Sequence, residues 1–232
     1  MTNSIIISVI LPSYLEEENL RFLLPRLNSV MDSLGVSYEV LVVDTISPMD
    51  GTRDVCEQNN VFYLNRVNGN LYGDAVRTGI SRACGDYLLF MDADGSHPPE
   101  FIRKMYEHVE GNDIVIASRY IAGGSTDNPK ILILMSLIVN ILYSLALNLK
   151  CKDVSNSFKL YRATLFEGIS LSCNNFDIVE EILFKIKKKH KNVIVKEVPF
   201  YFKKRMFGHT KRNLVVFIFS FIFTLIKLRF GK

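Results

Sequence analysis

The sequence has few of the residues that build metal clusters and covalent frameworks. Its four cysteines lie far apart without a Cys-X-X-Cys pair, and its four histidines are scattered, so the pattern favours neither a zinc site nor a disulfide scaffold. Internal repeats and low-complexity stretches are missing as well, which excludes repeat architectures and long disordered segments. The first apolar run, IIISVIL, has seven residues and no basic leader, which is too short for a signal peptide and suits a strand. We expect a protein of a reducing cytoplasm.

Acidic residues are scarce towards the C-terminus. Eleven of the 28 lysines and arginines fall between Lys185 and Arg212, where Glu197 is the only acid. The formal net charge of the chain is +4, so this stretch concentrates positive charge and favours an anionic partner. Aromatic platforms interleaved with the basic residues, as nucleic-acid binding requires, are not evident. We therefore expect no nucleic-acid partner, and phosphates or a membrane surface fit better.

The chain suits one well-buried α/β domain, because it has 232 residues of which 48% are hydrophobic. Over the first 120 residues, runs of β-branched and apolar residues alternate with helix-like segments of about ten residues, which predicts a mostly parallel central sheet covered on both faces. The expected strands are SIIISVILPSY, YEVLVVD, VFYLN, DYLLFMDAD and DIVIAS. The expected helices cover residues 16–34, 52–59, 73–83 and 99–110.

Polar residues stand at the carboxyl ends of the expected strands, where ligands bind in sheets of this kind. Tyr14 and Glu16 follow the first strand, Asp44 ends the second, and Asp92 and Asp94 end the fourth. A turn or a helix cap would explain one carboxylate of the last pair, but not both. Two carboxylates so close together repel each other unless a cation lies between them.

The pair Asp92 and Asp94 therefore predicts a cation site. The side chains of an extended Asp-X-Asp point to opposite faces, so both can serve one ligand only if the chain turns there, as Gly95 and Pro98 allow. Oxygen ligands shared with water and with the phosphates of a substrate suit Mg²⁺ or Mn²⁺.

Six segments carry a family resemblance, and they are LPSYLEEENL, VVDTISPMDGT, GDAVRTGISRACGDYLLFMDADGSHPP, SRYIAGG, DVSNSFKLYR and KEVPFYFKKRMFGHTK. Their order and spacing resemble those of family 2 glycosyltransferases, above all the branch of dolichyl-phosphate mannosyltransferases and bacterial polyprenyl-phosphate transferases. The resemblance runs from Ile5 to about Lys211. It implies a GT-A fold, a nucleotide-sugar donor such as GDP-mannose or a UDP-sugar, Mg²⁺ or Mn²⁺ on the acidic pair, and a polyprenyl phosphate as acceptor.

The resemblance also implies roles for individual residues. The implied nucleotide-binding residues are Pro12, Tyr14, Glu16, Asp44 and Asp92. The implied metal ligands are Asp92 and Asp94. The residues implied to face the acceptor phosphate are Arg119, Ser136 and Arg205. The residues implied to take part in catalysis are Asp94, Arg119, Arg205 and Lys211.

Four positions depart from the family pattern. Leu15 replaces the asparagine of LPTYNE, and Thr45 replaces the second aspartate of DDGSxDGT. Ser96 stands where this branch often has glutamine as a third metal ligand. Leu132 takes the place of a phosphate-binding arginine, which leaves Lys130 as the nearest cation. A non-catalytic scaffold subunit therefore remains an alternative of another class, although the intact acidic pair speaks against it.

The acceptor decides whether catalysis needs a base. A phosphate is already ionised at neutral pH, whereas a hydroxyl acceptor of an inverting enzyme needs a general base. The acids most easily cast in that role are Asp177 and Glu180. They could equally cap and solvate a helix, with Glu181 and Lys185 as an ordinary i,i+4 pair. Transfer to a saccharide hydroxyl in polysaccharide synthesis, with Asp177 or Glu180 as base, thus stays open.

Two apolar stretches complete the chain. Residues 131–149 contain 19 consecutive uncharged residues and residues 214–226 contain 13, which as helices are about 28 Å and about 20 Å long, against about 30 Å for a hydrocarbon core. A single crossing at 131–149 would place residues 153–162 and Arg205 across the bilayer from the acidic pair. The site would then be divided, which argues against a membrane-spanning helix. A polar stripe in the first stretch can lie against protein while the helix lies in the membrane interface, and it consists of Ser136, Asn140, Ser144 and Asn148.

These observations predict two parts of the chain. Residues 1–212 form the glycosyltransferase domain, with 131–149 as an interface helix inside it, and residues 213–232 form a membrane-associating helix. The cations that flank this helix favour anionic headgroups, and they are Lys211, Arg212, Lys227, Arg229 and Lys232. Packing in the core or in a homo-oligomer, or against a separate membrane subunit, is the alternative. We expect a peripheral or monotopic protein on the cytoplasmic face of a membrane.

Overall fold

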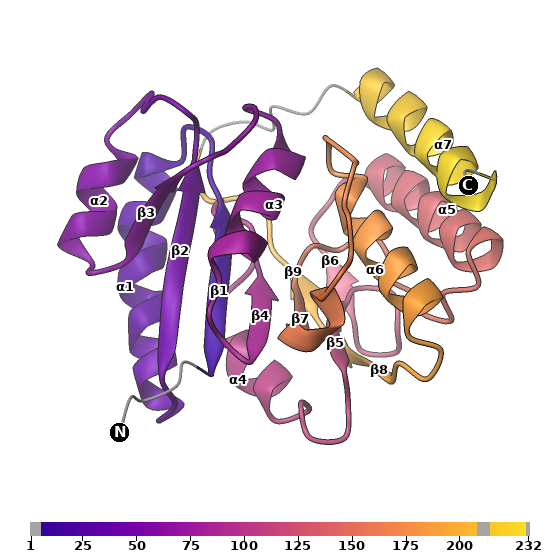
Figure 1. Ribbon diagram of the computed structural model, residues 1–232, viewed down its shortest axis with the longest axis horizontal. Coiled ribbons are helices and arrows are strands. Elements are labelled where there is room, and N and C mark those ends of the chain that lie inside the picture. Colours follow the sequence, from indigo (N-terminus) through magenta and orange to yellow (C-terminus); the bar gives the residue numbers. More distant parts are fainter. Residues whose placement is uncertain (1–5, 208–213, 231–232) are drawn as a thin grey trace.

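A twisted sheet forms the centre of the structure, which is a computed structural model (Figure 1). The structure describes residues 6–207 and 214–230. In the last helix, side chains are described at position 221 and from position 223 onward. The strands of the sheet are β1 (Ile7–Pro12), β2 (Tyr38–Asp44), β3 (Phe62–Asn65), β4 (Tyr87–Phe90), β5 (Ile114–Ser118), β7 (Lys159–Arg162) and β8 (Val195–Pro199). They lie in the order β3-β2-β1-β4-β7-β5-β8. Strand β7 runs antiparallel to β4 and β5, and the other pairs are parallel. The prediction of a mostly parallel sheet is confirmed.

Helices cover both faces of this sheet. They are α1 (Glu17–Ser33), α2 (Thr52–Gln58), α3 (Tyr72–Arg82), α4 (Phe101–Tyr106), α5 (Lys130–Ala146), α6 (Ile178–Lys189) and α7 (Leu214–Phe230). A 3₁₀ turn (Ala163–Phe166) and a small parallel pair, β6 (Ser125–Thr126) with β9 (Tyr201–Phe202), complete the fold. The helix expected over 99–110 is shorter than predicted, because the chain closes into tight turns after Tyr106 and Gly111 adopts a left-handed φ of 72°.

Two apolar layers hold the helices to the sheet. On β1, Val9 and Leu11 point into the layer formed with α1, α2 and α4, whereas Ile10 points into the layer formed with α3, α5, α6 and α7. This alternation is the period-2 pattern of a strand that is buried on both faces. Helices α5 and α7 lie side by side at one end of the molecule, far from α1 and α2 at the other end (Figure 1).

The carboxyl ends of β1, β2 and β4 meet at one edge of the sheet. Strand β4 ends at Phe90, so the strand predicted to reach Asp94 is too long. The chain leaves the sheet there and turns at Gly95, whose φ of 78° is a left-handed conformation that glycine adopts without strain. The predicted turn at the acidic pair is confirmed.

The two apolar stretches form helices that pack on the core. The Tyr143 hydroxyl on α5 donates to the carbonyl of Phe221 on α7 at 2.7 Å, and Thr224 on α7 donates to the carboxylate of Asp177. The polar stripe is confirmed at Asn140, which is buried, but α5 ends at Ala146, and Asn148 is exposed beyond it. None of the helices in the described part of the chain has the length and apolar character needed to cross a membrane.

One of the departures from the family pattern carries backbone strain. Leu15 has a φ of 54°, in a left-handed region that costs an ordinary side chain roughly 1–2 kcal/mol and that asparagine tolerates best after glycine. Leu15→Asn should therefore raise the free energy of unfolding by about 0.5–1 kcal/mol, measured by urea denaturation. The control is Val67→Asn, since Val67 is an exposed loop residue outside that region. An equal change in both variants would contradict strain at Leu15.

Candidate active site

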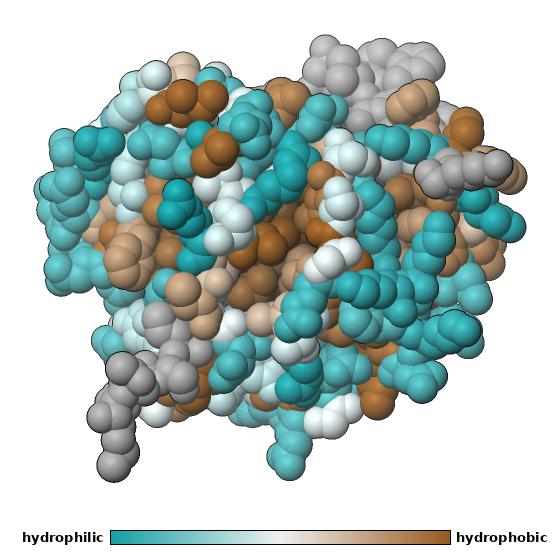
Figure 2. Space-filling model, in the orientation of Figure 1, coloured by the Kyte–Doolittle hydropathy of each residue, from teal (hydrophilic) through white to brown (hydrophobic). Residues whose placement is uncertain are grey.

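A cavity of about 1090 Å³ lies at the carboxyl edge of the sheet. In the view of Figure 2, hydrophobic side chains gather in the middle of the molecule, between hydrophilic ones. The lining comes from the segments that follow β1, β2, β3, β4, β5 and β9, from the turn before β7, and from α5, α6 and α7. Among the predicted site residues, those that line the cavity are Pro12, Tyr14, Glu16, Asp92, Asp94, Arg119, Ser136 and Arg205.

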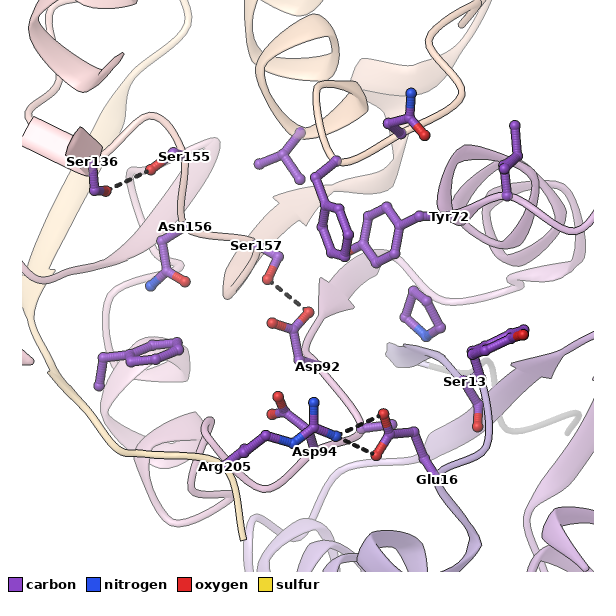
Figure 3. Close-up of a pocket in the computed structure, with 18 of the residues that line it drawn as sticks. Ser13, Glu16, Tyr72, Asp92, Asp94, Ser136, Ser155, Asn156, Ser157 and Arg205 are labelled. Atoms are coloured by element: carbon purple, nitrogen blue, oxygen red, sulfur yellow. Dashed lines mark hydrogen bonds and ion pairs between the residues drawn. The ribbon is translucent and has the colours of Figure 1, made fainter. Parts of the chain in front are cut away.

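The acidic pair is oriented by serines. The Ser157 hydroxyl donates to Asp92 Oδ1 at 2.9 Å (Figure 3). The backbone N–H and hydroxyl of Ser96 donate to Asp94 Oδ1 at 3.0 and 2.6 Å. Ser96 is buried, so at the position of the implied third ligand it orients Asp94. The second oxygen of each carboxylate accepts no hydrogen bond from the described residues.

The donor set fits a divalent cation. Two carboxylates reach one cavity, and the described residues contain no cluster of three or more His, Cys, Asp and Glu side chains that would form an all-protein cage. Mg²⁺ and Mn²⁺ are bound in this way, by one or two carboxylates, with water and substrate phosphates in the other positions. A bound ion would act here as a Lewis acid on a leaving diphosphate.

A histidine that the sequence analysis did not single out supports the acidic turn. The backbone N–H of Asp92 donates to His97 Nδ1 at 2.9 Å, so the ring accepts at this nitrogen. The ring stacks on Phe158 at 4.7 Å between centroids, and burial lowers the pKa of His97. A neutral imidazole therefore supports the turn without cancelling its charge. In the sequence, the only signal for this role of His97 is its position directly after Asp-Gly-Ser.

The predicted nucleotide side and acceptor side of the cavity are joined by one ion pair. Nη2 of Arg205 lies 3.0 Å from both carboxylate oxygens of Glu16, which is 189 residues away in the sequence (Figure 3). Asn19 donates to the same carboxylate and accepts from the Phe207 N–H. The N–H of Met206 donates to the carbonyl of Asp94 at 3.0 Å. The segment 203–207 thus connects the turn after β1 to the acidic turn.

Arg119 is held by the turn before β7. Its Nε and Nη2 donate to Asp153 at 2.8 and 2.7 Å, and Nη2 also donates to Ser155 at 3.0 Å. The hydroxyls of Ser155 and Ser136 lie 3.4 Å apart (Figure 3). Leu132 lines the cavity at the place of the family arginine. The acceptor roles of Arg119 and Ser136 stay predictions, and Lys211 lies outside the described residues.

The predicted nucleotide residue Asp44 does not line the cavity. Its carboxylate is buried and accepts from the Tyr63 hydroxyl at 3.1 Å, and burial raises the pKa of Asp44. Sequence reasoning missed Arg66, a buried lining residue directly after β3 that donates to the carbonyls of Ser13 and Asn70. Arg66 thereby ties the turn after β1 to the loop before α3.

The two candidates for a general base lie outside the cavity lining. Asp177 accepts from Thr224 of α7, and Glu180 is fully buried. Their neighbours Asn175, Phe176 and Val179 line the cavity instead. Both carboxylates are buried and neither lines the cavity, so a role as general base stays a prediction for each.

The fold and the cavity place the chain in the GT-A class of α/β proteins. The solved structure of glucosyl-3-phosphoglycerate synthase from Mycobacterium tuberculosis in complex with Mn²⁺, UDP and glucosyl-3-phosphoglycerate superposes with a TM-score of 0.73. The match covers 96% of this chain and 79% of that chain at 17% identity. A structure of the same enzyme with Mg²⁺ and UDP gives a TM-score of 0.73 with the same coverage at 18% identity. At such identities the likeness shows the fold.

The chain belongs to glycosyl transferase family 2, whose profile matches residues 8–170. It is 36% identical over 212 residues to the dolichol-phosphate mannosyltransferase of Pyrococcus furiosus, a match that covers 88% of this chain and 58% of that protein. It is 33% identical over 217 residues to the undecaprenyl-phosphate mannosyltransferase of Micrococcus luteus, with 88% and 86% covered. The chain thus spans little more than half of the archaeal relative. The family profile and the two relatives place the chain among glycosyltransferases.

Asp92→Asn and Asp94→Asn should each weaken Mn²⁺ binding at least about tenfold, because each removes one of two anionic ligands. The measurement is titration followed by the electron paramagnetic resonance signal of free Mn²⁺. Asp86→Asn is the matched control, since Asp86 is an exposed aspartate that precedes β4, whereas the acidic pair follows it. Unchanged affinity in both variants would exclude the acidic pair as the cation site.

Proposed function

We propose that this protein transfers one sugar, with inversion, from GDP-mannose or a UDP-sugar to a polyprenyl phosphate, using Mg²⁺ or Mn²⁺ held by Asp92 and Asp94. The observation that carries the proposal is the two-sided character of the cavity. One end holds the acidic pair, and the other is lined by apolar side chains of α5 and α7, namely Leu132, Met135, Val139 and Phe221. The names of the two curated mannosyltransferases support a lipid phosphate as acceptor.

The charges of the lining favour a phosphate over a hydroxyl acceptor. The carboxylates among the described lining residues are Glu16, Asp92 and Asp94. Glu16 is paired with Arg205, and the other two are assigned to the cation. No carboxylate of this set is left to deprotonate a hydroxyl, whereas an ionised phosphate attacks without a base.

Arg205 is the group that meets the acceptor phosphate in this proposal. Its guanidinium is partly exposed, with 17% of the side chain accessible, and its carboxylate partner is 11% accessible. A phosphate that enters from the apolar end can take over guanidinium donors that now face Glu16, because arginine binds both anions with the same fork geometry. Glu16 then becomes available for the donor nucleotide.

The same proposal places the protein on the cytoplasmic face of a membrane as a peripheral protein. Helix α5 exposes a row of apolar side chains at helical spacing, Ile131, Leu134, Ile138, Ile141, Leu142 and Leu145. Helix α7, packed beside it, exposes Phe223, Ile226 and Phe230. Exposed Lys227 and Arg229 on α7 suit anionic headgroups. This apolar face lies next to the apolar end of the cavity, where the lipid tail must leave.

Purified protein incubated with radiolabelled nucleotide sugar and polyprenyl phosphate should label the organic phase only when Mn²⁺ or Mg²⁺ is present. Arg205→Ala should lower kcat/KM for the acceptor by about ten- to a hundredfold, because it removes charge-assisted bonds worth roughly 1.5–3 kcal/mol. Nucleotide affinity should change little. Arg26→Ala is the matched control, since Arg26 forms a comparable bidentate pair with Glu100 on the exposed surface.

Other outcomes of this assay separate the alternatives. Label found only on a saccharide would replace the lipid acceptor with a hydroxyl. A scaffold role would follow if no donor supported transfer and Asp94→Ala left the function in cells unaltered. A large loss of nucleotide affinity in Arg205→Ala would move Arg205 to the donor side.

The double variant Ile138→Glu/Leu145→Glu should lose most of its binding to vesicles that contain anionic lipid, measured by co-sedimentation. Both side chains are exposed, so the fold does not depend on them, whereas two charges on the apolar face oppose burial in the membrane interface. The control is Phe62→Glu/Ile194→Glu, which adds the same charges beside the edge strands of the sheet. Equal binding of both double variants would count against this face as the membrane surface.

A further inference from the structure

A charged side chain without a role in the chemistry proposed above lies beneath the cavity. Lys159, the first residue of β7, is completely buried, and it is not among the residues that line the cavity. Its ammonium group donates to the carbonyl of Val154 at 2.8 Å and to the carbonyl of Asn156. Burying an ammonium group costs roughly several kcal/mol unless the group is paired and hydrogen-bonded. A residue retained at this cost requires an explanation.

The two carbonyls belong to the serine turn, which we define as residues 153–157. Hydrogen bonds of other residues in the serine turn also fix its position. The Asp153 carboxylate accepts from Arg119 and from the N–H of Asn156, and the Asn156 side chain donates to the carbonyl of Ala117 at 2.6 Å. The N–H of Ser155 donates to Asn140 on α5 at 2.9 Å. The serine turn is therefore fixed to β5, α5 and β7 at once.

The serine turn presents Ser155, Asn156 and Ser157 to the cavity (Figure 3). Among the described residues, Ser157 is the one whose side chain donates a hydrogen bond to the Asp92 carboxylate, at Oδ1. The direction in which Asp92 points thus depends on the position of Ser157. That position depends in turn on the two carbonyls held by Lys159, which lie three residues and one residue before Ser157 in the chain.

Opposite charges keep the ammonium group ionised. Glu180 of α6, fully buried, and Asp153 both favour the charged form of Lys159, against the burial that is the largest influence. Burial lowers the pKa of Lys159 to about 8, so the group is still mainly protonated at neutral pH. Arg119 opposes the charged form.

We propose that Lys159 is a positioning residue for the acidic pair: it fixes the serine turn so that Ser157 holds Asp92 in the orientation that a divalent cation requires. The inference rests on the cation site of the proposed function, but it does not depend on which sugar or acceptor is used. It predicts that loss of the Lys159 ammonium group weakens metal binding only by displacing Ser157.

Lys159→Met keeps the length and the apolar stem of the side chain and removes the ammonium group. It should weaken Mn²⁺ binding about tenfold, measured from the electron paramagnetic resonance signal of free Mn²⁺, which corresponds to about 1.4 kcal/mol. Binding of UDP and GDP without metal, measured by calorimetry, should stay within about twofold. Arg162→Met is the matched control, because Arg162 is a partly exposed cation on the same strand that pairs with Asp113.

A double-mutant cycle separates positioning from general damage to the fold. Ser157→Ala should cause a similar loss of Mn²⁺ affinity, and Lys159→Met/Ser157→Ala should lose no more than the larger single variant, since both act on one contact. Lys159→Met/Glu180→Gln removes one buried positive and one buried negative group together, and it should retain the thermal stability of the parent together with the weak Mn²⁺ binding.

Two results would overturn the inference. One is unchanged Mn²⁺ affinity in a folded protein that lacks the Lys159 ammonium group. The other is additive losses in the cycle, which would show that Lys159 and Ser157 act independently. If the unaltered protein bound no Mn²⁺ at all, the cation site of the proposed function would fail first and this inference with it, and that outcome is distinguishable from the other two.

Discussion

The repulsion between Asp92 and Asp94 is the constraint on which the rest of the site depends. Two carboxylates on one cavity favour protonation or separation unless positive charge is supplied. In the described structure neither forms an ion pair with lysine or arginine, and each is oriented by a serine. Other carboxylates close by are neutralised by arginines, Glu16 by Arg205 and Asp153 by Arg119. The distribution of cations thus leaves the acidic pair with negative charge that no lysine or arginine of the described residues offsets, and a divalent cation shared with a diphosphate is suited to offset it.

Much of this arrangement could be predicted from the sequence because it is local. The alternation of apolar strands and helices predicts the mostly parallel sheet. Asp-Gly with the following prolines predicts the turn that brings both carboxylates to one cavity. What could not be predicted depends on contacts between distant segments. The insertion of antiparallel β7 between β4 and β5, the pair of Glu16 with Arg205, and the hydrogen bond from Thr224 to Asp177 have no signal in local periodicity. The buried state of Asp44 depends likewise on Tyr63 of the neighbouring strand.

The fold by itself does not determine the acceptor. A soluble-substrate enzyme such as glucosyl-3-phosphoglycerate synthase shares it at 17% identity. The features that favour a lipid here are the apolar residues that α5 and α7 contribute to the cavity and the apolar face of the same two helices outside it. In the proposed function, the inner and outer surfaces of one helix pair serve the two ends of one lipid molecule, its phosphate near the proposed metal site and its tail in the membrane interface.

The two arginines of the cavity differ in how easily an acceptor phosphate can recruit them. Arg119 and Asp153 are 8% and 0% accessible, and separating a buried pair costs roughly 3–5 kcal/mol, because a charge is left uncompensated. The side chains of Arg205 and Glu16 are 17% and 11% accessible, so a phosphate can reach this pair with less rearrangement than the more deeply buried pair of Arg119 and Asp153 requires. In the proposed function Arg205 is therefore the arginine that exchanges a carboxylate for a phosphate, while Arg119 holds the serine turn in place. On this proposal the acceptor phosphate and the Glu16 carboxylate compete for a single guanidinium group.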